Sequence, residues 1–349
     1  MTMMNDREWD LITMGQLLVR LSPPGFGRLS RAGSLDVNVG GAELNVAAGA
    51  AELGLRTAFF SRLADNAVGD MARSVIRSFG VSDRYLLRDP SPDSRVGLYY
   101  YEYAAAPRTP LVVYDRKDPG FYGLRPEDAD PAMFRAARCF HVSGITLGLG
   151  PQVRETAIRC MKAFREAGAL ISFDVNFRAN LWTGEEARQT IREILPLVDI
   201  FFCSDSTALL TFGLEGSPRE KIRAFAEEFP LRAVFSTIRT IHEDGTQDFG
   251  SCGYDAASGA FFEEATYTGI RPIDRIGSGD AYCAGVLAGL LSGEEAFGEK
   301  AITRAVRCGN AAAALKNSVA GDLPQMTRKE VEALMEAHAA GAAAGDIRR

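Results

Sequence analysis

Apolar positions along the chain fall into two patterns, which predict strands and helices in regular alternation. The apolar runs of strand length are residues 11–15, 57–63, 137–144, 169–176, 199–204 and 232–237. The stretches with helical spacing are residues 42–54, 68–79, 153–168, 185–198 and 218–229. The central strands are apolar throughout, which is typical of parallel strands buried on both faces. This repetition of strand and helix predicts an α/β protein.

Two regions depart from the alternation. Residues 93–120 hold two aromatic and β-branched runs around a proline-containing turn, which predicts a β-hairpin. Together with the strand-rich residues 17–38, this hairpin is expected to form a small sheet that stands off the main body. From residue 281 the sequence favours helices, and the Ala- and Gly-rich residues 340–349 are expected to fray.

Composition excludes several classes of protein. The 349 residues carry a formal net charge of −6 and no dense Lys/Arg cluster, which argues against a nucleic-acid partner. No apolar run approaches the ~20 residues of a membrane span, and the polar start resembles no export signal, so a cytoplasmic protein without a membrane partner is expected. The six cysteines lack zinc or redox spacing and are expected to be reduced and mostly buried.

The segment with the clearest chemistry is the run Gly277, Ser278, Gly279 directly before Asp280, followed by a helical stretch of small residues. The N–H groups at a helix N-terminus bind anions. A carboxylate placed there suits a base that removes a hydroxyl proton while the same N–H groups hold a phosphoryl group. The alternative is that Asp280 only caps the helix.

Other chemistries find little support in the sequence. Tyr282 stands where a dinucleotide-binding fingerprint needs its third glycine, which disfavours a Rossmann oxidoreductase, and there is no Gly-Lys pair for a Walker loop. With three histidines and no GxSxG segment, a Ser/His/Asp hydrolase is disfavoured too. His141 lies in an apolar run and is expected to be a core histidine, and His242 to Asp244 a charged loop.

Three segments, in order, resemble motifs of the ribokinase-like (PfkB) sugar kinases: residues 39–54, 174–182 and 277–285. Residues 97–116, 274–282 and 316–334 look similar to 2-keto-3-deoxygluconate kinases within that family. The resemblance implies a three-layer α/β/α body with a mostly parallel central sheet and a small β-sheet lid. It implies one domain over residues 1–349, with a lid from about 17–38 and 93–120.

The resemblance also implies an activity: ATP-dependent phosphorylation of a sugar's terminal hydroxyl, with Mg²⁺. Asp280 would be the catalytic base, and Gly277, Ser278 and Gly279 would form the anion hole. The sugar-binding residues implied are Gly40, Gly41, Asn45, Tyr99, Tyr114, Arg116, Arg178 and Asp280. The nucleotide-binding residues implied are Asn176, Ser204, Thr237, Arg239, Gly277, Gly279 and Asn310. No metal ligand is assigned.

The two arginines bear on substrate choice. A neutral sugar needs no guanidinium, whereas a sugar acid presents a carboxylate that arginine binds with two parallel hydrogen bonds. The hypothesis is therefore a kinase of 2-keto-3-deoxygluconate. The alternatives are that Arg116 is a surface charge beside Asp115 and that Arg178 forms an ion pair with Asp174.

Two segments depart from the family pattern. Residues 204–207 lack the glutamate of the Asn-x-x-Glu motif, and Asp205 is the nearest carboxylate. Residues 236–244 lack the glycines that relatives often have in the ATP loop. A fructokinase or another kinase of the family, and a sugar-binding relative with weak turnover, stay as alternatives. The expected partners are a sugar or sugar acid, a nucleotide, and a second copy bound through the lid.

Overall fold

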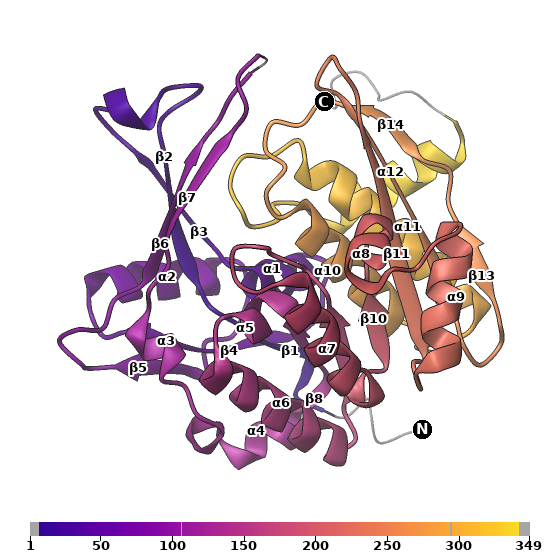
Figure 1. Cartoon of the computed structure of the whole chain (residues 1–349), viewed down its shortest axis with the longest axis horizontal. Helices are drawn as coiled ribbons and strands as arrows, with labels where there is room; N and C mark the ends of the chain where they lie inside the picture. The colour runs from indigo at the N-terminus through magenta and orange to yellow at the C-terminus, as the bar shows by residue number, and fades with distance from the viewer. Residues whose placement is uncertain (1–6, 106, 294, 342–349) are drawn as a thin grey trace.

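The computed structural model describes residues 7–105, 107–293 and 295–341, and in this part of the chain ten strands form one large sheet (Figure 1). Its strand order is β13-β12-β11-β10-β9-β8-β1-β4-β5, with β14 paired to β12. The strands are β1 (Trp9–Met14), β4 (Thr57–Ala64), β5 (Leu86–Asp89), β8 (Ala137–Ser143), β9 (Leu170–Asp174), β10 (Ile200–Phe202), β11 (Ala233–Ile241), β12 (Gln247–Asp255), β13 (Phe261–Glu263) and β14 (Tyr267–Ile270).

Every neighbouring pair from β11 to β5 is parallel, which confirms the predicted α/β class with a mostly parallel central sheet. Helices cover both faces of this sheet (Figure 1). They are α1 (Ala42–Glu52), α2 (Ala67–Ser78), α3 (Pro119–Tyr122), α4 (Pro131–Ala136), α5 (Gly144–Gly148), α6 (Pro151–Glu166), α7 (Gly184–Ile194), α8 (Asp205–Phe212), α9 (Pro218–Glu228), α10 (Ser278–Leu291), α11 (Glu299–Lys316) and α12 (Arg328–Ala339).

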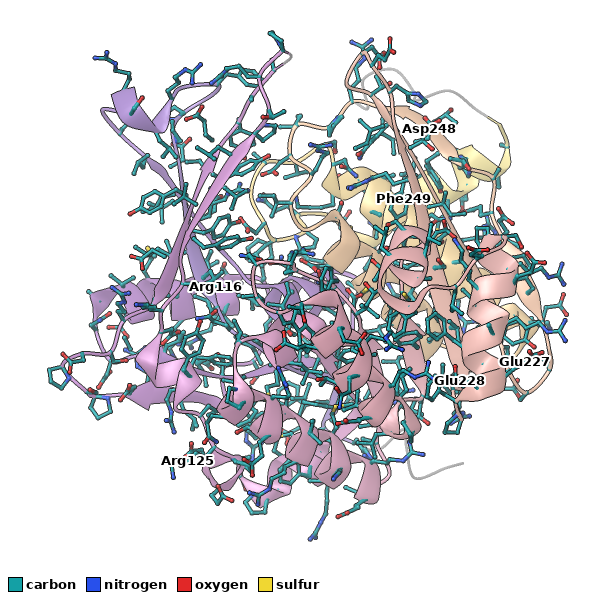
Figure 2. All side chains as sticks on the ribbon, viewed as in Figure 1. Arg116, Arg125, Glu227, Glu228, Asp248 and Phe249 are labelled. Carbon is teal, nitrogen blue, oxygen red and sulfur yellow. The ribbon has the colours of Figure 1, made fainter. Side chains whose placement is uncertain are left out.

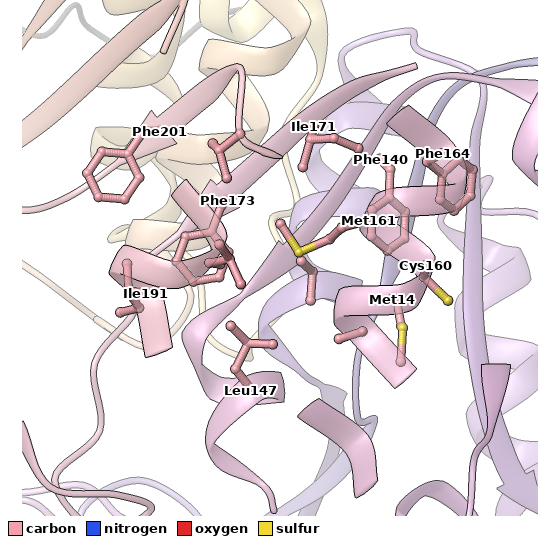
Figure 3. Packing of buried hydrophobic residues seen from close by; sticks show 14 of the residues in the cluster. Met14, Phe140, Leu147, Cys160, Met161, Phe164, Ile171, Phe173, Ile191 and Phe201 are labelled. Carbon is pink, nitrogen blue, oxygen red and sulfur yellow. The ribbon is translucent and has the colours of Figure 1, made fainter. Parts of the chain in front are cut away.

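The apolar strands serve two cores at once. Successive strand residues point to opposite faces, so Cys139 packs with α10 and α11 while Phe140 packs with α6. Figure 3 shows the second core, where the rings of Phe140 and Phe164 stack with centroids 4.4 Å apart. Because both faces are buried, apolar residues are favoured on both, which is why the strands show no regular alternation of apolar and polar residues.

A smaller sheet of four strands projects from the body (Figure 1). We call it the lid sheet; its strands are β2 (Leu18–Ser22), β3 (Asp36–Gly40), β6 (Gly97–Glu102) and β7 (Leu111–Asp115). The pair β2–β6 is parallel and the other pairs are antiparallel. The small sheet is confirmed. It exposes apolar side chains, including Val37, Leu111 and Val113. That a second copy covers them stays a prediction.

The sequence did not predict β12, and it ended β11 too early. β11 continues to Ile241 and returns as β12, so Arg239, like Thr237, lies on a strand and not in a loop after it. Two glycines weaken the strand pattern of β12, and Gly253 is needed there because a Cβ would come 2.8 Å from the Phe235 ring.

The chain ends lie largely outside the described residues, and so does most of the predicted frayed segment 340–349. Among the residues that the structure describes, no helix combines the length and the apolar character that crossing a membrane requires.

Replacing Phe140 by alanine is expected to lower the free energy of unfolding by about 3–5 kcal/mol, because the fully buried ring leaves a cavity against Phe164. Urea unfolding measures the change. The control is Leu210→Ala in α8, whose side chain is 83% exposed and should matter by less than about 0.5 kcal/mol. Equal losses in the two variants would contradict this account of the core.

Candidate active site

A cavity of about 880 Å³ lies between the lid sheet and the carboxyl ends of the parallel strands. The segments that follow β9 and β10, together with residues of β11, line it from the body, as expected for a parallel sheet, whose strands all end at one edge. The lid sheet contributes Tyr99, Tyr114 and the adjoining Arg116. The cavity also contains most other residues that the sequence singled out: Gly41, Asn45, Asn176, Arg178, Ser204, Thr237, Arg239, Gly277, Ser278, Gly279 and Asp280.

The start of α10 is set by Gly277, where both the backbone angle and the neighbouring chain disfavour a side chain. Gly277 has a left-handed backbone with φ of 82°, and a Cβ there would lie 2.2 Å from the carbonyl oxygen of Asp322. Because Gly277 offers no side chain, no side-chain hydrogen bond from this position caps the helix. The first turn therefore presents N–H groups and the positive end of the helix dipole at the cavity wall.

Asp280 lies in this first turn and is almost completely buried. Asn45 donates to Oδ2 at 2.7 Å, and Asn176 donates to Oδ1 at 3.3 Å. The carboxylate is thus held by side chains from two other segments. Burial raises the pKa of Asp280 to about 6, while the hydrogen bond from Asn45 and the charge of Arg178 oppose that rise. An acid of this pKa is ionised at neutral pH and can still accept a proton.

The last residue of β9, Asp174, places a second carboxylate near Asp280. Asn176 has φ of 35° and is the one non-glycine residue of the described chain with positive φ. Such strain gathers at functional sites. Its N–H donates to Asp174 Oδ1 at 3.1 Å. Burial and the charge of Asp280 raise the pKa of Asp174 to about 7.

Two arginines face the same cavity. Arg116 leaves the lid sheet, lies over the ring of Tyr114 at 5.1 Å, and donates through Nε to Gln16 Oε1 at 3.2 Å. Burial lowers the pKa of Arg116, and the charge of Arg178 acts in the same direction. Figure 2 shows Arg116 where the lid sheet meets the body. Arg116 is therefore no free surface charge. Arg178 does not form the alternative ion pair with Asp174 but donates to the carbonyl of Phe177 at 2.9 Å.

Three of the residues predicted to bind the nucleotide, Ser204, Thr237 and Arg239, lie on the wall of the cavity. Ser204 caps α8 by accepting from Thr207 N–H at 3.2 Å, so its hydroxyl is already engaged. Asp205 lies 2.7 Å from the ammonium of Lys221, a buried cation. Thr237 and Arg239 line the same wall from β11.

Two predicted site residues lie elsewhere. Asn310 is fully buried in α11, where it accepts from Ser251 at 2.6 Å and donates to Glu264 at 3.0 Å, so the structure does not place it on the cavity wall. Gly40 does not line the cavity either. A Cβ at Gly40 would lie 2.5 Å from the Asp322 side chain, so this glycine makes room for Asp322.

Sequence reasoning missed other residues on the wall, among them Gln16, Asp174, Arg275 and Asp322. Asp174, Arg275 and Asp322 lie inside the segments 174–182, 274–282 and 316–334, so the resemblance offered a signal for them. The contacts of Asp322 with Tyr99 and Arg20 could not be predicted, because they join segments more than two hundred residues apart.

Within the described residues, no group of three or more His, Cys, Asp and Glu side chains could hold a metal by itself. Mg²⁺ usually takes only one or two carboxylates and completes its shell with water and substrate phosphates. Asp174 fits that role, because a cation would relieve its repulsion with Asp280. Asp205 fits less well, since Lys221 already neutralises it.

The predictions of a core histidine at 141 and of free, mostly buried cysteines are confirmed. His141 is buried, shares a hydrogen bond of 2.8 Å with Ser172, and has its pKa lowered to about 3 by burial, so it is a core histidine. All six cysteines are free, and five of them are buried.

Known proteins resemble the chain over nearly its whole length. The family model described as "pfkB family carbohydrate kinase" matches residues 10–327. A 2-dehydro-3-deoxygalactonokinase of Haloferax volcanii is 33% identical over 95% of this chain and 98% of its own. A fructokinase of Escherichia coli is 29% identical over 91% and 97%. The crystal structure of a 2-dehydro-3-deoxygluconokinase from Thermotoga maritima superimposes with a TM-score of 0.86 at 29% identity, covering 94% and 98%.

These matches extend through the lid sheet, the cavity wall and α10, and they agree with the ribokinase-like architecture of the body. The chain therefore belongs to the pfkB family of carbohydrate kinases and is a phosphotransferase.

Proposed function

We propose that the enzyme transfers a phosphoryl group from ATP to the terminal hydroxyl of 2-keto-3-deoxygluconate or its galacto epimer. The observation that supports an acid sugar is the pair Arg116 and Arg178, two like charges that interact across the same cavity. In the described part of the chain neither forms a salt bridge. A ligand carboxylate offsets their repulsion and binds a guanidinium with two hydrogen bonds.

Asp280 is the proposed base. Its carboxylate accepts the proton of the sugar hydroxyl as the oxygen attacks phosphorus, and Asn45 and Asn176 keep it oriented. The N–H groups at the start of α10 donate to the transferring phosphoryl oxygens, and the helix dipole stabilises their charge. Thr237 and Arg239 contact the nucleotide. A Mg²⁺ ion beside Asp174 would neutralise phosphate charge when bound.

The first alternative is a kinase of a neutral sugar, and the fructokinase among the relatives keeps it open. It assigns no ligand to the guanidinium of Arg116, which Gln16 holds toward the cavity. The second is a sugar-binding protein with little turnover, which the missing glutamate at residues 204–207 motivates. ADP release measured with acid and neutral sugars separates the acid-sugar kinase, the neutral-sugar kinase and the binding protein.

Purified enzyme with ATP and Mg²⁺ is expected to release ADP with 2-keto-3-deoxygluconate or its galacto epimer, and not with fructose, ribose or no sugar.

Asp280→Asn should lower kcat by at least about 100-fold, because the amide cannot accept the proton, while the sugar still binds. Calorimetry measures that binding. Turnover on fructose alone would overturn the acid substrate, and near-normal turnover of the variant would remove Asp280 as the base.

Arg116→Ala is expected to raise KM for the acid sugar by about 10- to 100-fold, since a hydrogen-bonded charge contributes about 1.5–3 kcal/mol. Steady-state kinetics with acid and neutral sugars measure the selectivity. The matched control is Arg95→Ala, an exposed arginine that pairs with Asp115 beside it at 3.1 Å and should leave KM unchanged. Equal weakening of acid and neutral sugars would refute the carboxylate contact.

The acid limb of kcat/KM is expected near pH 6, because Asp280 must be ionised to act as a base and its pKa is raised to about 6. Activity should fall about tenfold per pH unit below this value. Asn45→Ala removes a hydrogen bond that favours the charged form, so the limb should move to higher pH. A limb that stays in place in this variant, or one near pH 4, would contradict the assignment.

A further inference from the structure

The lid sheet carries a charged side chain in its interior. Arg20 lies on β2, between Asn38 of β3 and Tyr99 of β6 in the strand register, and is 0% exposed. A buried guanidinium is stable only with good partners, because removing its charge from water costs several kcal/mol. The origin of those partners decides what Arg20 can do.

The partners come from the body. Arg20 Nη2 donates to Asp274 Oδ2 at 2.7 Å, and Nε lies 3.2 Å from Asp322 Oδ2. Two lid tyrosines complete the cluster, since Tyr103 donates to Asp274 at 2.7 Å and Tyr99 donates to Asp322. The two carboxylates raise the pKa of Arg20 although burial alone would lower it.

The same carboxylates fix the loop that begins α10. Asp274 Oδ1 accepts from the N–H of Ile276 at 3.0 Å, and Oδ2 also accepts from the N–H of Gly321 at 3.1 Å. The carbonyl of Asp322 fills the place of a Cβ on Gly277. The loops at 274–277 and 321–322 therefore depend on two acids whose charge Arg20 compensates.

A second buried cation lies on the body side of the cluster. Lys316, at the end of α11, donates to the carbonyl of Val319 at 3.1 Å and interacts electrostatically with Asp274 and Asp322. Two cations thus face two carboxylates. Of the two cations, only Arg20 belongs to the lid sheet, so Arg20 is the cation that joins the lid to the body, beside the hydrogen bonds of Tyr99 and Tyr103.

We infer that Arg20 is a positioning residue that couples the lid sheet to the phosphoryl-binding turn at Gly277–Gly279, an inference that rests on the proposed function. By holding Asp274 and Asp322, Arg20 fixes the position of the lid tyrosines relative to the first N–H groups of α10. A displacement of 1 Å at such a site can lower a rate by about 100-fold. Arg20 itself touches neither substrate, so its effect passes through the two acids.

The test compares Arg20→Gln and Arg20→Lys with a matched control. Arg138→Gln alters a buried ion pair at the far end of α10, where Arg138 lies 3.0 Å from Asp10 and donates to the carbonyl of Leu291. All three variants should lose stability. Arg20→Gln should also lower kcat, by about 10- to 100-fold, and raise KM for the sugar, because the lid and the turn both shift, whereas Arg138→Gln should leave both constants unchanged. Arg20→Lys keeps the charge and should restore part of kcat.

Hydrogen exchange supplies a readout that does not need turnover. Amides of residues 276–281 and 321 should exchange faster in Arg20→Gln than in wild type and unchanged in Arg138→Gln. Normal kcat, KM and local exchange in folded Arg20→Gln would overturn the inference. If that variant does not fold, Arg20→Lys decides, and wild-type kcat and exchange in it would overturn the inference. Wild-type enzyme that phosphorylates no sugar of the panel would refute the proposed function, whereas the exchange result would still decide the coupling.

Discussion

The burial of the Asp280 carboxylate at the positive end of α10 is the constraint on which the rest of the site depends. Burial alone would keep the acid protonated and useless as a base. Amide donors on both oxygens, from Asn45 and Asn176, and the charge of Arg178 favour the ionised form. The balance leaves a pKa of about 6, at which the group is charged at neutral pH yet remains basic. Besides burial, the charge of Asp280 contributes to the raised pKa of the neighbouring Asp174, which is about 7.

Several distant segments must meet before this balance exists. The small residues after Asp280 serve packing, since a Cβ at Gly285 would come 2.7 Å from the carbonyl of Cys308 in α11 and one at Gly289 would come 2.7 Å from Ala305. The close contact of α10 with α11 fixes the axis of the helix. The carbonyl of Asp322 fixes its first residue, and Arg20 holds Asp322 from the lid. The position of one carboxylate therefore depends on the tertiary structure of the whole chain.

Sequence alone predicted what is encoded locally. Runs such as 137–144 are rich in apolar residues because both sides of the strand are buried, and the left-handed backbone of Gly277 before Asp280 favours glycine. It failed where a residue's role depends on distant partners. Asn310 has the chemistry of a ligand-binding amide, but Ser251 and Glu264 satisfy it inside the fold. Arg20 lies in a strand of apolar and polar residues, and no neighbouring residue in the sequence indicates that Asp274 and Asp322 neutralise its charge.

The arginines show how the same physics gives opposite results. Arg20 is neutralised within the protein, so its charge holds the fold and is closed to ligands. Arg116 and Arg178 line the same cavity, and repulsion by Arg178, which is exposed to solvent, adds to the effect of burial on the guanidinium of Arg116. An anionic ligand removes that repulsion on binding, whereas a neutral sugar leaves it in place. Under the proposed function, this repulsion contributes to selectivity for an acid together with the contacts of the complex.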